Sequence, residues 1–329
     1  MSGSFDLHAH FAPQGFWEQI ERLGGDRIGV RRGPDLGFEF LLDGTWRNDM
    51  CLPALQDWEQ RLAMMDQQGI RAQVISVTAN PHVTWADPAV GLELSRQIND
   101  ELGWATTMWP GRIYGWAAIP LQDVRLAIPE LRRAKEIGLV GVQIPSHVGP
   151  IELDDAVLDP FWEAAEDLDF PVFVHNQALG GDPRIPGRLR HVIGAPLETT
   201  IAVTRLIFAS IPDRYPKVRF LLTHGGGTLP YIVGRLDRAW EVMGRPLPNP
   251  PSVTLRGFWY DTVLQEPSIM EHLLRFAGPL RVVVGTDYPY PLGQELSDGL
   301  PVGLVVPTEL RGAILQTNAE ALLGRGLSP

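Results

Sequence analysis

The chain repeats one pattern along most of its length: a short apolar run, then a longer segment with apolar residues at helical spacing. The short runs are rich in β-branched and aromatic residues, which favours strands. Strands that alternate with helices are typical of βαβ units and a parallel sheet. The first predicted strand starts at Phe5 and ends in His8 and His10; the others are 72–78, 113–118, 140–145, 171–175, 218–224, 258–261 and 282–287.

The longer segments fit amphipathic helices. They are 58–68, 88–109, 125–138, 159–168, 197–210, 229–243, 266–277 and a final segment, 308–323. Eight strand–helix units without a break in composition predict a single-domain (β/α)8 TIM barrel over residues 1–329. A doubly wound open sheet is the alternative, but no G-x-G-x-x-G sequence follows a predicted strand.

Residues 11–56 interrupt the pattern directly after the first strand. They contain scattered glycine, proline and aromatic residues with little periodicity. Long irregular segments inside compact domains are usually functional or disordered. We therefore predict a long loop insertion that contributes to the active site.

Composition narrows the class of protein. The 329 residues are 44% hydrophobic and 20% charged, as in an ordinary globular protein, and the net charge of −11 argues against a nucleic-acid partner. No apolar run approaches the roughly 18 residues that span a bilayer, and no signal-peptide pattern precedes the first strand. The single cysteine, Cys51, excludes an internal disulfide and fits a reducing compartment, so a cytoplasmic location is expected.

Ionisable side chains stand at the ends of four predicted strands, where a barrel builds its active site. Residues two apart in a strand point to the same face, so His8 and His10 face one space. His175 ends the fifth strand, His224 the sixth and Asp287 the eighth, each after an apolar run. Imidazole and carboxylate groups bind metals; three histidines with one carboxylate suit zinc, and manganese or iron are alternatives.

The number of metal ions follows from the scarcity of lysine. Two-metal barrels of this general kind often bridge their ions with a carbamylated lysine at the end of the fourth strand. Here that strand ends Gln143-Ile144-Pro145, and Lys135 and Lys217 lie elsewhere in the predicted topology. One divalent metal ion per chain is therefore expected.

The other histidines are weaker candidates for the active site. His147 and His191 follow the fourth and fifth strands, so either could line a pocket. His82 and His272 fall in loop or helix patterns and are expected at the surface.

Several short sequences resemble the amidohydrolase superfamily, in its branch of mononuclear metal-dependent decarboxylases. Each is short, and their order and spacing together carry the resemblance. They are His8-Ala9-His10, 141–148, His175, 196–200, His224-Gly225-Gly226-Gly227, 233–236 and 285–293.

The resemblance implies a role for each strand-end residue. It implies His8, His10, His175 and Asp287 as the metal ligands. It implies His224 as a residue that contacts the metal-bound water and works in acid–base catalysis, with Asp287 as a second catalytic group.

The resemblance also implies three substrate-binding residues. Arg47, in the insertion, is similar to an arginine that binds a substrate carboxylate. Arg235 is similar to an arginine that reaches the neighbouring subunit's site, which implies a homodimer. Tyr290 stands where decarboxylases of hydroxylated benzoates carry a tyrosine.

The implied activity is non-oxidative decarboxylation of an amino- or hydroxy-substituted unsaturated or aromatic carboxylic acid. The chain departs from part of the branch at His175-Asn176-Gln177, where a His-Pro-Trp sequence is usual in aminocarboxymuconate-type members. This difference concerns the substrate more than the reaction class. A hydrolase of an amide or lactone, or a hydratase, is the alternative, because the same metal and His224 would serve it. A non-catalytic metal-binding barrel is a third.

Overall fold

The structure is a computed structural model that describes residues 3–25, 28–33, 37–42, 45–78, 82–176, 184–185 and 189–327. For the described residues between 30 and 51 it describes the backbone alone.

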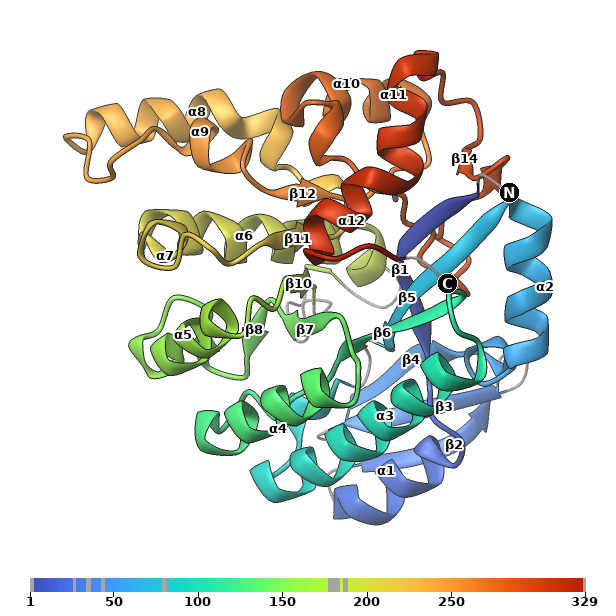
Figure 1. The fold of residues 1–329 in the computed structure, drawn as a ribbon. Coiled ribbons are helices and arrows are strands. Elements are labelled where there is room, and N and C mark those ends of the chain that lie inside the picture. Colours follow the sequence, from blue (N-terminus) through green and yellow to red (C-terminus); the bar gives the residue numbers. More distant parts are fainter. Residues whose placement is uncertain are drawn as a thin grey trace.

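A parallel sheet curls through the centre of the molecule (Figure 1). Its order is β1 (Ser4–Phe11), β5 (Ile70–Val77), β6 (Ile113–Ala117), β7 (Gly141–Pro145), β10 (Val172–His175), β11 (Phe220–Leu222) and β12 (Trp259–Tyr260). Residues 282–284 occupy the eighth strand position and close the barrel. Val282 forms a parallel bridge with Tyr260, and Val284 forms one with Asp6. The predicted (β/α)8 barrel is confirmed.

Helices surround the strands on the outside (Figure 1). Those between strands are α2 (Trp58–Gln68), α3 (Pro88–Met108), α4 (Val124–Glu136), α5 (Asp159–Asp167), α6 (Ala195–Phe208), α7 (Ile211–Arg214), α8 (Leu229–Val242), α9 (Pro251–Leu255) and α10 (Pro267–Ala277). The chain closes with α11 (Thr308–Gly312) and α12 (Asn318–Leu323), joined by a π-helical turn. Short hairpin strands lie outside the barrel: β8 (His147–Val148), β9 (Ile151–Glu152), β13 (Leu296–Ser297) and β14 (Leu300–Pro301).

The insertion after β1 is more regular than predicted. It contains helix α1 (Phe16–Gly24) and an antiparallel sheet of β2 (Ile28–Gly33), β3 (Gly37–Leu42) and β4 (Thr45–Cys51). The expectation of an irregular loop was wrong, because β2 and β4 carry glycine and charged residues in place of the apolar runs that mark the barrel strands.

Two apolar clusters lie on the two faces of the barrel wall. The larger packs the outward side chains of the strands against the helices. The smaller takes alternate residues of the strands, such as Phe5, Leu7, Trp116 and Phe173, together with α12, so it fills the interior and α12 closes one end. Interior positions beyond this cluster, toward the carboxyl ends of the strands, are therefore left for polar chemistry.

A shift in register between Asp6 and Ala9 re-aims the end of β1. Phe5 and Leu7 face the interior, and a regular strand would turn His8 and His10 outward. The irregularity lets these histidines face inward as well, and both are fully buried.

Among the residues described, no helix combines the length and the apolar character that a bilayer crossing requires.

Candidate metal centre

Four predicted residues converge at the carboxyl ends of the strands. His8 and His10 come from β1, His175 ends β10, and Asp287 follows the bridging segment 282–284. One ligand atom from each lies within 4.8 Å of the other three, and all four residues are buried.

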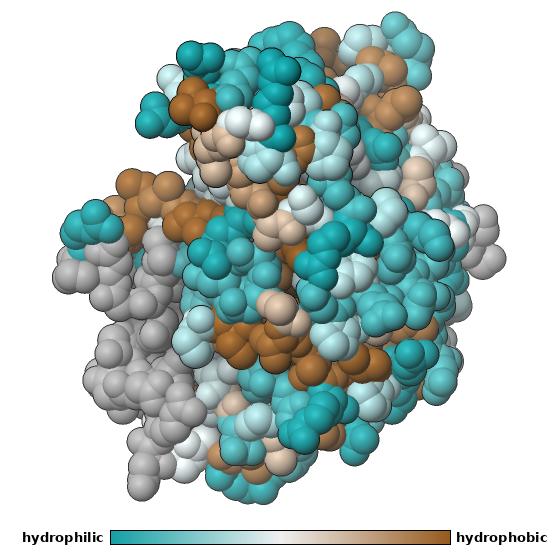
Figure 2. All heavy atoms as spheres, turned by 90° about the vertical axis from the view of Figure 1, so that its left-hand side faces the viewer, coloured by the Kyte–Doolittle hydropathy of each residue, from teal (hydrophilic) through white to brown (hydrophobic). Residues whose placement is uncertain are grey.

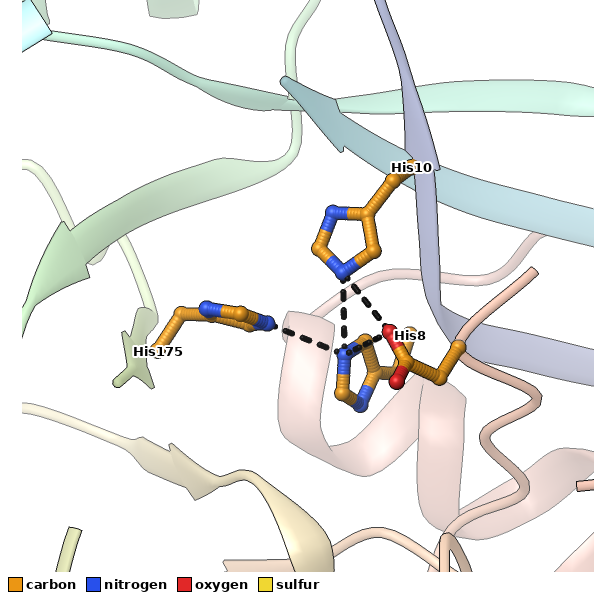
Figure 3. A group of neighbouring side chains, drawn as sticks. His8, His10 and His175 are labelled. Carbon is orange, nitrogen blue, oxygen red and sulfur yellow. Dashed lines mark hydrogen bonds and ion pairs between the residues drawn. The ribbon is translucent and has the colours of Figure 1, made fainter. Parts of the chain in front are cut away.

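The nitrogen atoms point to a common centre (Figure 3). His8 Nε2 lies 3.1 Å from both His10 Nε2 and His175 Nε2. Asp287 Oδ1 lies 3.2 Å from His8 Nε2 and 3.0 Å from His10 Nε2. Four ligands about 2.0–2.1 Å from a tetrahedral zinc ion are separated by about 3.3 Å, so the cluster fits a cation with little movement.

The second nitrogen of each imidazole has its own partner. His8 Nδ1 lies 2.6 Å from Asp261 Oδ2, and His175 Nδ1 lies 3.1 Å from the Asn176 carbonyl. His10 Nδ1 lies 3.3 Å from the Val77 carbonyl. Such contacts hold Nδ1 as the protonated nitrogen and leave Nε2 free to coordinate.

The electrostatics of the cluster favour a positive charge at its centre. Burial opposes a charge on His8, but Asp287 and Asp261 outweigh it and raise the pKa of His8 to about 10. Burial lowers the pKa of His10 and that of His175. Burial also opposes ionisation of Asp287, yet the surrounding histidines, His8 first, hold its pKa well below the usual range. A divalent cation supplies the positive charge that this ionised carboxylate attracts.

The donor set supports one ion. In the described part of the chain, these four residues are the one group arranged to hold a metal. Strand β7 ends in Pro145, without the lysine that would bridge a second ion.

His224 stands beside the cluster without joining it. Its Nε2 lies 3.8 Å from Asp287 Oδ2, and the Asn176 side-chain nitrogen lies 3.0 Å from its Nδ1. The side chain is 18% exposed, whereas those of His8 and His10 are fully buried, so His224 faces both the cluster and the pocket.

A pocket of about 310 Å³ opens on the cluster. His175, His224 and Asp287 form its polar floor, and the walls are mostly apolar; these and the other lining residues are Asn176, His191, Val192, Ala195, Pro196, Gly227, Val263, Leu264, Gln265, Tyr290 and Leu292. The volume suits one small organic acid.

Some of the remaining predicted residues line the pocket and others do not. Tyr290 lines the pocket, its ring centre 5.3 Å from that of His10, and its hydroxyl is hydrogen-bonded to the Thr78 hydroxyl. His191 also lines the pocket, whereas His147 contacts Glu198 outside the lining.

Neither predicted arginine is among the described residues that line the pocket. Arg235 is exposed on α8 and is not among the lining residues. The backbone of Arg47 pairs with Phe40 in the insertion sheet, but its side chain is outside the described residues, as is that of Cys51.

One site residue and one buried residue were missed in the sequence. Asp261 follows β12 and touches His8, and it ends an apolar strand as His175 and His224 do, so the same signal could have found it. His82, expected at the surface, is 2% exposed, and burial lowers its pKa to about 4. His272 is exposed as expected.

Comparison with known proteins agrees with this geometry. The sequence pattern of the Amidohydrolase family matches residues 5–325. The chain belongs to the amidohydrolase family. The matched region includes the barrel and all four residues of the metal cluster.

Relatives of this amidohydrolase are decarboxylases. It is 30% identical to a 2-amino-3-carboxymuconate-6-semialdehyde decarboxylase of Dictyostelium discoideum, over 97% of this chain and 89% of that protein. It is 30% identical to a gamma-resorcylate decarboxylase of Polaromonas sp. strain JS666, over 88% of this chain and 89% of that protein.

A solved structure supports the same branch. The dihydroxybenzoic acid decarboxylase from Polaromonas sp. JS666, determined with bound manganese and the inhibitor 2-nitroresorcinol, superposes with a TM-score of 0.75. The two are 26% identical over 98% of this chain and 97% of that one. The protein is therefore an amidohydrolase of the metal-dependent decarboxylase branch.

Proposed function

We propose that this enzyme removes CO2 from a small amino- or hydroxy-substituted aromatic or unsaturated carboxylic acid. The observation that carries the proposal is the position of His224, which faces a pocket of the right size beside a four-donor metal cluster without being one of the donors. The names of the relatives support this class of substrate.

The proposed ligands are His8, His10, His175 and Asp287, and the proposed ion is zinc, which suits nitrogen-rich sites. When bound, the metal acts as a Lewis acid and template for the oxygen atoms of the substrate. The residues around it orient the acid and exclude water from most of its surface.

The reaction needs one proton at the carbon that loses CO2. The bond between this carbon and the carboxylate breaks, its electron pair stays on the carbon, and an acid delivers a proton there. His224 is the proposed acid because it faces the pocket without being one of the four donors, and Asp287, 3.8 Å from it, is the alternative acid. Tyr290, on the pocket wall, and Arg47 are the proposed substrate-binding residues, Arg47 through a two-point contact with a carboxylate.

The proposal is tested by measuring products. The metal-saturated protein is incubated with dihydroxybenzoates and with 2-amino-3-carboxymuconate 6-semialdehyde, and released CO2 and the decarboxylated product are measured. One of these acids should yield equal amounts of both, and His175→Ala, which removes a proposed ligand, should yield neither.

A parallel incubation with amides and lactones addresses the alternative. Hydrolysis of these compounds, with no CO2 from any acid, would show that the enzyme is a hydrolase of the same family.

We also propose that the active unit is a homodimer in which Arg235 reaches the partner's pocket. Three apolar side chains at and beside the helix that carries it, Tyr231, Val242 and Met243, are 89%, 72% and 62% exposed. Figure 2 shows one side of the molecule, with apolar side chains gathered in patches among hydrophilic ones. Apolar surface of this kind suits burial between subunits.

A further inference from the structure

We infer that Asp261 is a positioning residue that fixes His8 and His224 together, so that one carboxylate sets both the metal ligand and the acid–base group. The inference rests on the proposed metal centre. It does not depend on which acid is decarboxylated.

The contacts of Asp261 carry the first step. It lies directly after β12 and is fully buried. Its Oδ2 lies 2.6 Å from His8 Nδ1 and accepts a hydrogen bond of 3.0 Å from the His224 backbone N–H. Its Oδ1 accepts from the backbone N–H groups of Gly225, at 2.9 Å, and Val263, at 3.1 Å. Four donors therefore surround two oxygen atoms.

The backbone that Asp261 holds is strained. His224 has a φ of 52°, in the left-handed region that residues with a Cβ rarely adopt, and Gly225 follows with a φ of 58°. Successive N–H groups in such a turn point to one side and form a nest for an anion. The Asp261 carboxylate fills that nest, and the turn in consequence directs the His224 imidazole toward Asp287 and the pocket.

The same oxygen atom sets the protonation of His8. A carboxylate oxygen only accepts hydrogen bonds, so Nδ1 of His8 keeps its hydrogen, and Nε2 is the nitrogen whose lone pair would bind the metal. His8 Nε2 points to the centre of the cluster, where it lies 3.1 Å from the Nε2 atoms of His10 and His175. Loss of the Asp261 carboxylate would therefore have two effects: it would weaken metal coordination by His8, and it would displace His224.

An amide cannot take this place. Asparagine has the shape of aspartate, but one of its two ends is an NH2 group that donates. If the NH2 group faces His8, it meets the His224 N–H and favours the His8 tautomer with hydrogen on Nε2. If it faces the other way, it meets the N–H groups of Gly225 and Val263. In both orientations donors face donors.

The test compares Asp261→Asn with Glu130→Gln. Glu130 is another buried carboxylate with its own hydrogen-bond partners, Asn99 and Arg133, on α4 outside the pocket. Zinc affinity is measured by competition with a chromophoric chelator, and the cobalt-substituted proteins are compared by visible absorption. Neither measurement needs a substrate.

Asp261→Asn should bind zinc about 10–100-fold more weakly and show an altered cobalt spectrum, as loss of a ligand's hydrogen-bond partner typically does. At saturating metal, its kcat for any acid that the wild type decarboxylates should still fall, because His224 is displaced. Glu130→Gln should keep the wild-type affinity and spectrum. Wild-type affinity and spectrum in Asp261→Asn would overturn the inference.

A second measurement covers the case in which Asp261→Asn does not fold. Nitrogen NMR of the zinc-loaded wild type, labelled at histidine, should show His8 protonated on Nδ1. A His8 that carries its hydrogen on Nε2, or on neither nitrogen, would overturn the inference. Failure to find a decarboxylated acid would count against the proposed function alone, since affinity, spectrum and NMR are read without one.

Discussion

At the scale of single residues, histidines of the same site occupy two different environments. His175 is buried with its Nε2 at the centre of the donor cluster, whereas His224 lies beside the cluster and reaches the pocket. This difference in position predicts a difference in role, which substitution can separate.

His224→Ala should keep about one equivalent of metal per chain and lose turnover by about 10²–10⁴-fold, the usual contribution of a general acid or base. His175→Ala should lose the metal itself, because it removes one of four donors. Elemental analysis after metal saturation and gel filtration measures the metal content of both variants, and a decarboxylation assay measures turnover. Equal loss of metal in the two variants would contradict the role assigned to His224, and two tightly bound equivalents in the wild type would contradict a mononuclear centre.

At the scale of elements, the glycine turn after β11 brings the start of α8 against α6. Gly227 has a φ of 64°, and a Cβ atom there would lie 2.2 Å from the Pro196 carbonyl oxygen. Backbone of another element cannot move aside as a flexible side chain can. The turn that carries His224 therefore depends on a residue without a side chain.

Gly227→Ala should lower the free energy of unfolding, and Gly15→Ala is its matched control. Gly15 also has a positive φ, of 66°, but a Cβ atom there would meet nothing within 4 Å. The control should cost about 1–2 kcal/mol, from the left-handed backbone alone. Gly227→Ala should cost about 1–3 kcal/mol more, from overpacking, in denaturant unfolding of the metal-saturated proteins. Equal costs would show that α6 moves to make room.

At the scale of the whole molecule, the proposed dimer makes a prediction about mixed subunits. Arg235→Ala and His8→Ala should each be inactive alone, the first without a substrate contact and the second without a metal ligand. In a mixed dimer, one site combines an intact metal centre with an intact Arg235 from the other subunit. Mixing should therefore restore part of the activity, which a decarboxylation assay measures.

Subunit exchange is checked separately, by mass spectrometry of differently tagged chains. No recovery after demonstrated exchange would mean that Arg235 acts within its own chain or has no catalytic role. Recovery by two monomeric variants, without a detectable dimer, would equally contradict the proposal.

Local patterns in the sequence specify the alternation of strands and helices and the residue types at the strand ends. The predicted helix at 58–68 has the observed bounds of α2, because the capping Asp57 and the C-terminal Gly69 mark its ends locally. Strand-end histidines were likewise visible, since a polar residue after a buried run is a local signal. The insertion sheet gave no such signal, because β2 and β4 carry glycine and charged residues and no apolar run.

The distances between the site residues follow from the closed barrel and not from any local pattern. His8 and Asp261 are 253 positions apart in the chain and 2.6 Å apart in space, because the barrel closes through residues 282–284 between β12 and β1. The inward direction of His8 and His10 depends on a register shift against β5, and no pattern within β1 predicts it. Contacts between elements depend on how the strands pair and how the barrel closes. A local sequence pattern describes one strand and does not specify its register against a neighbour.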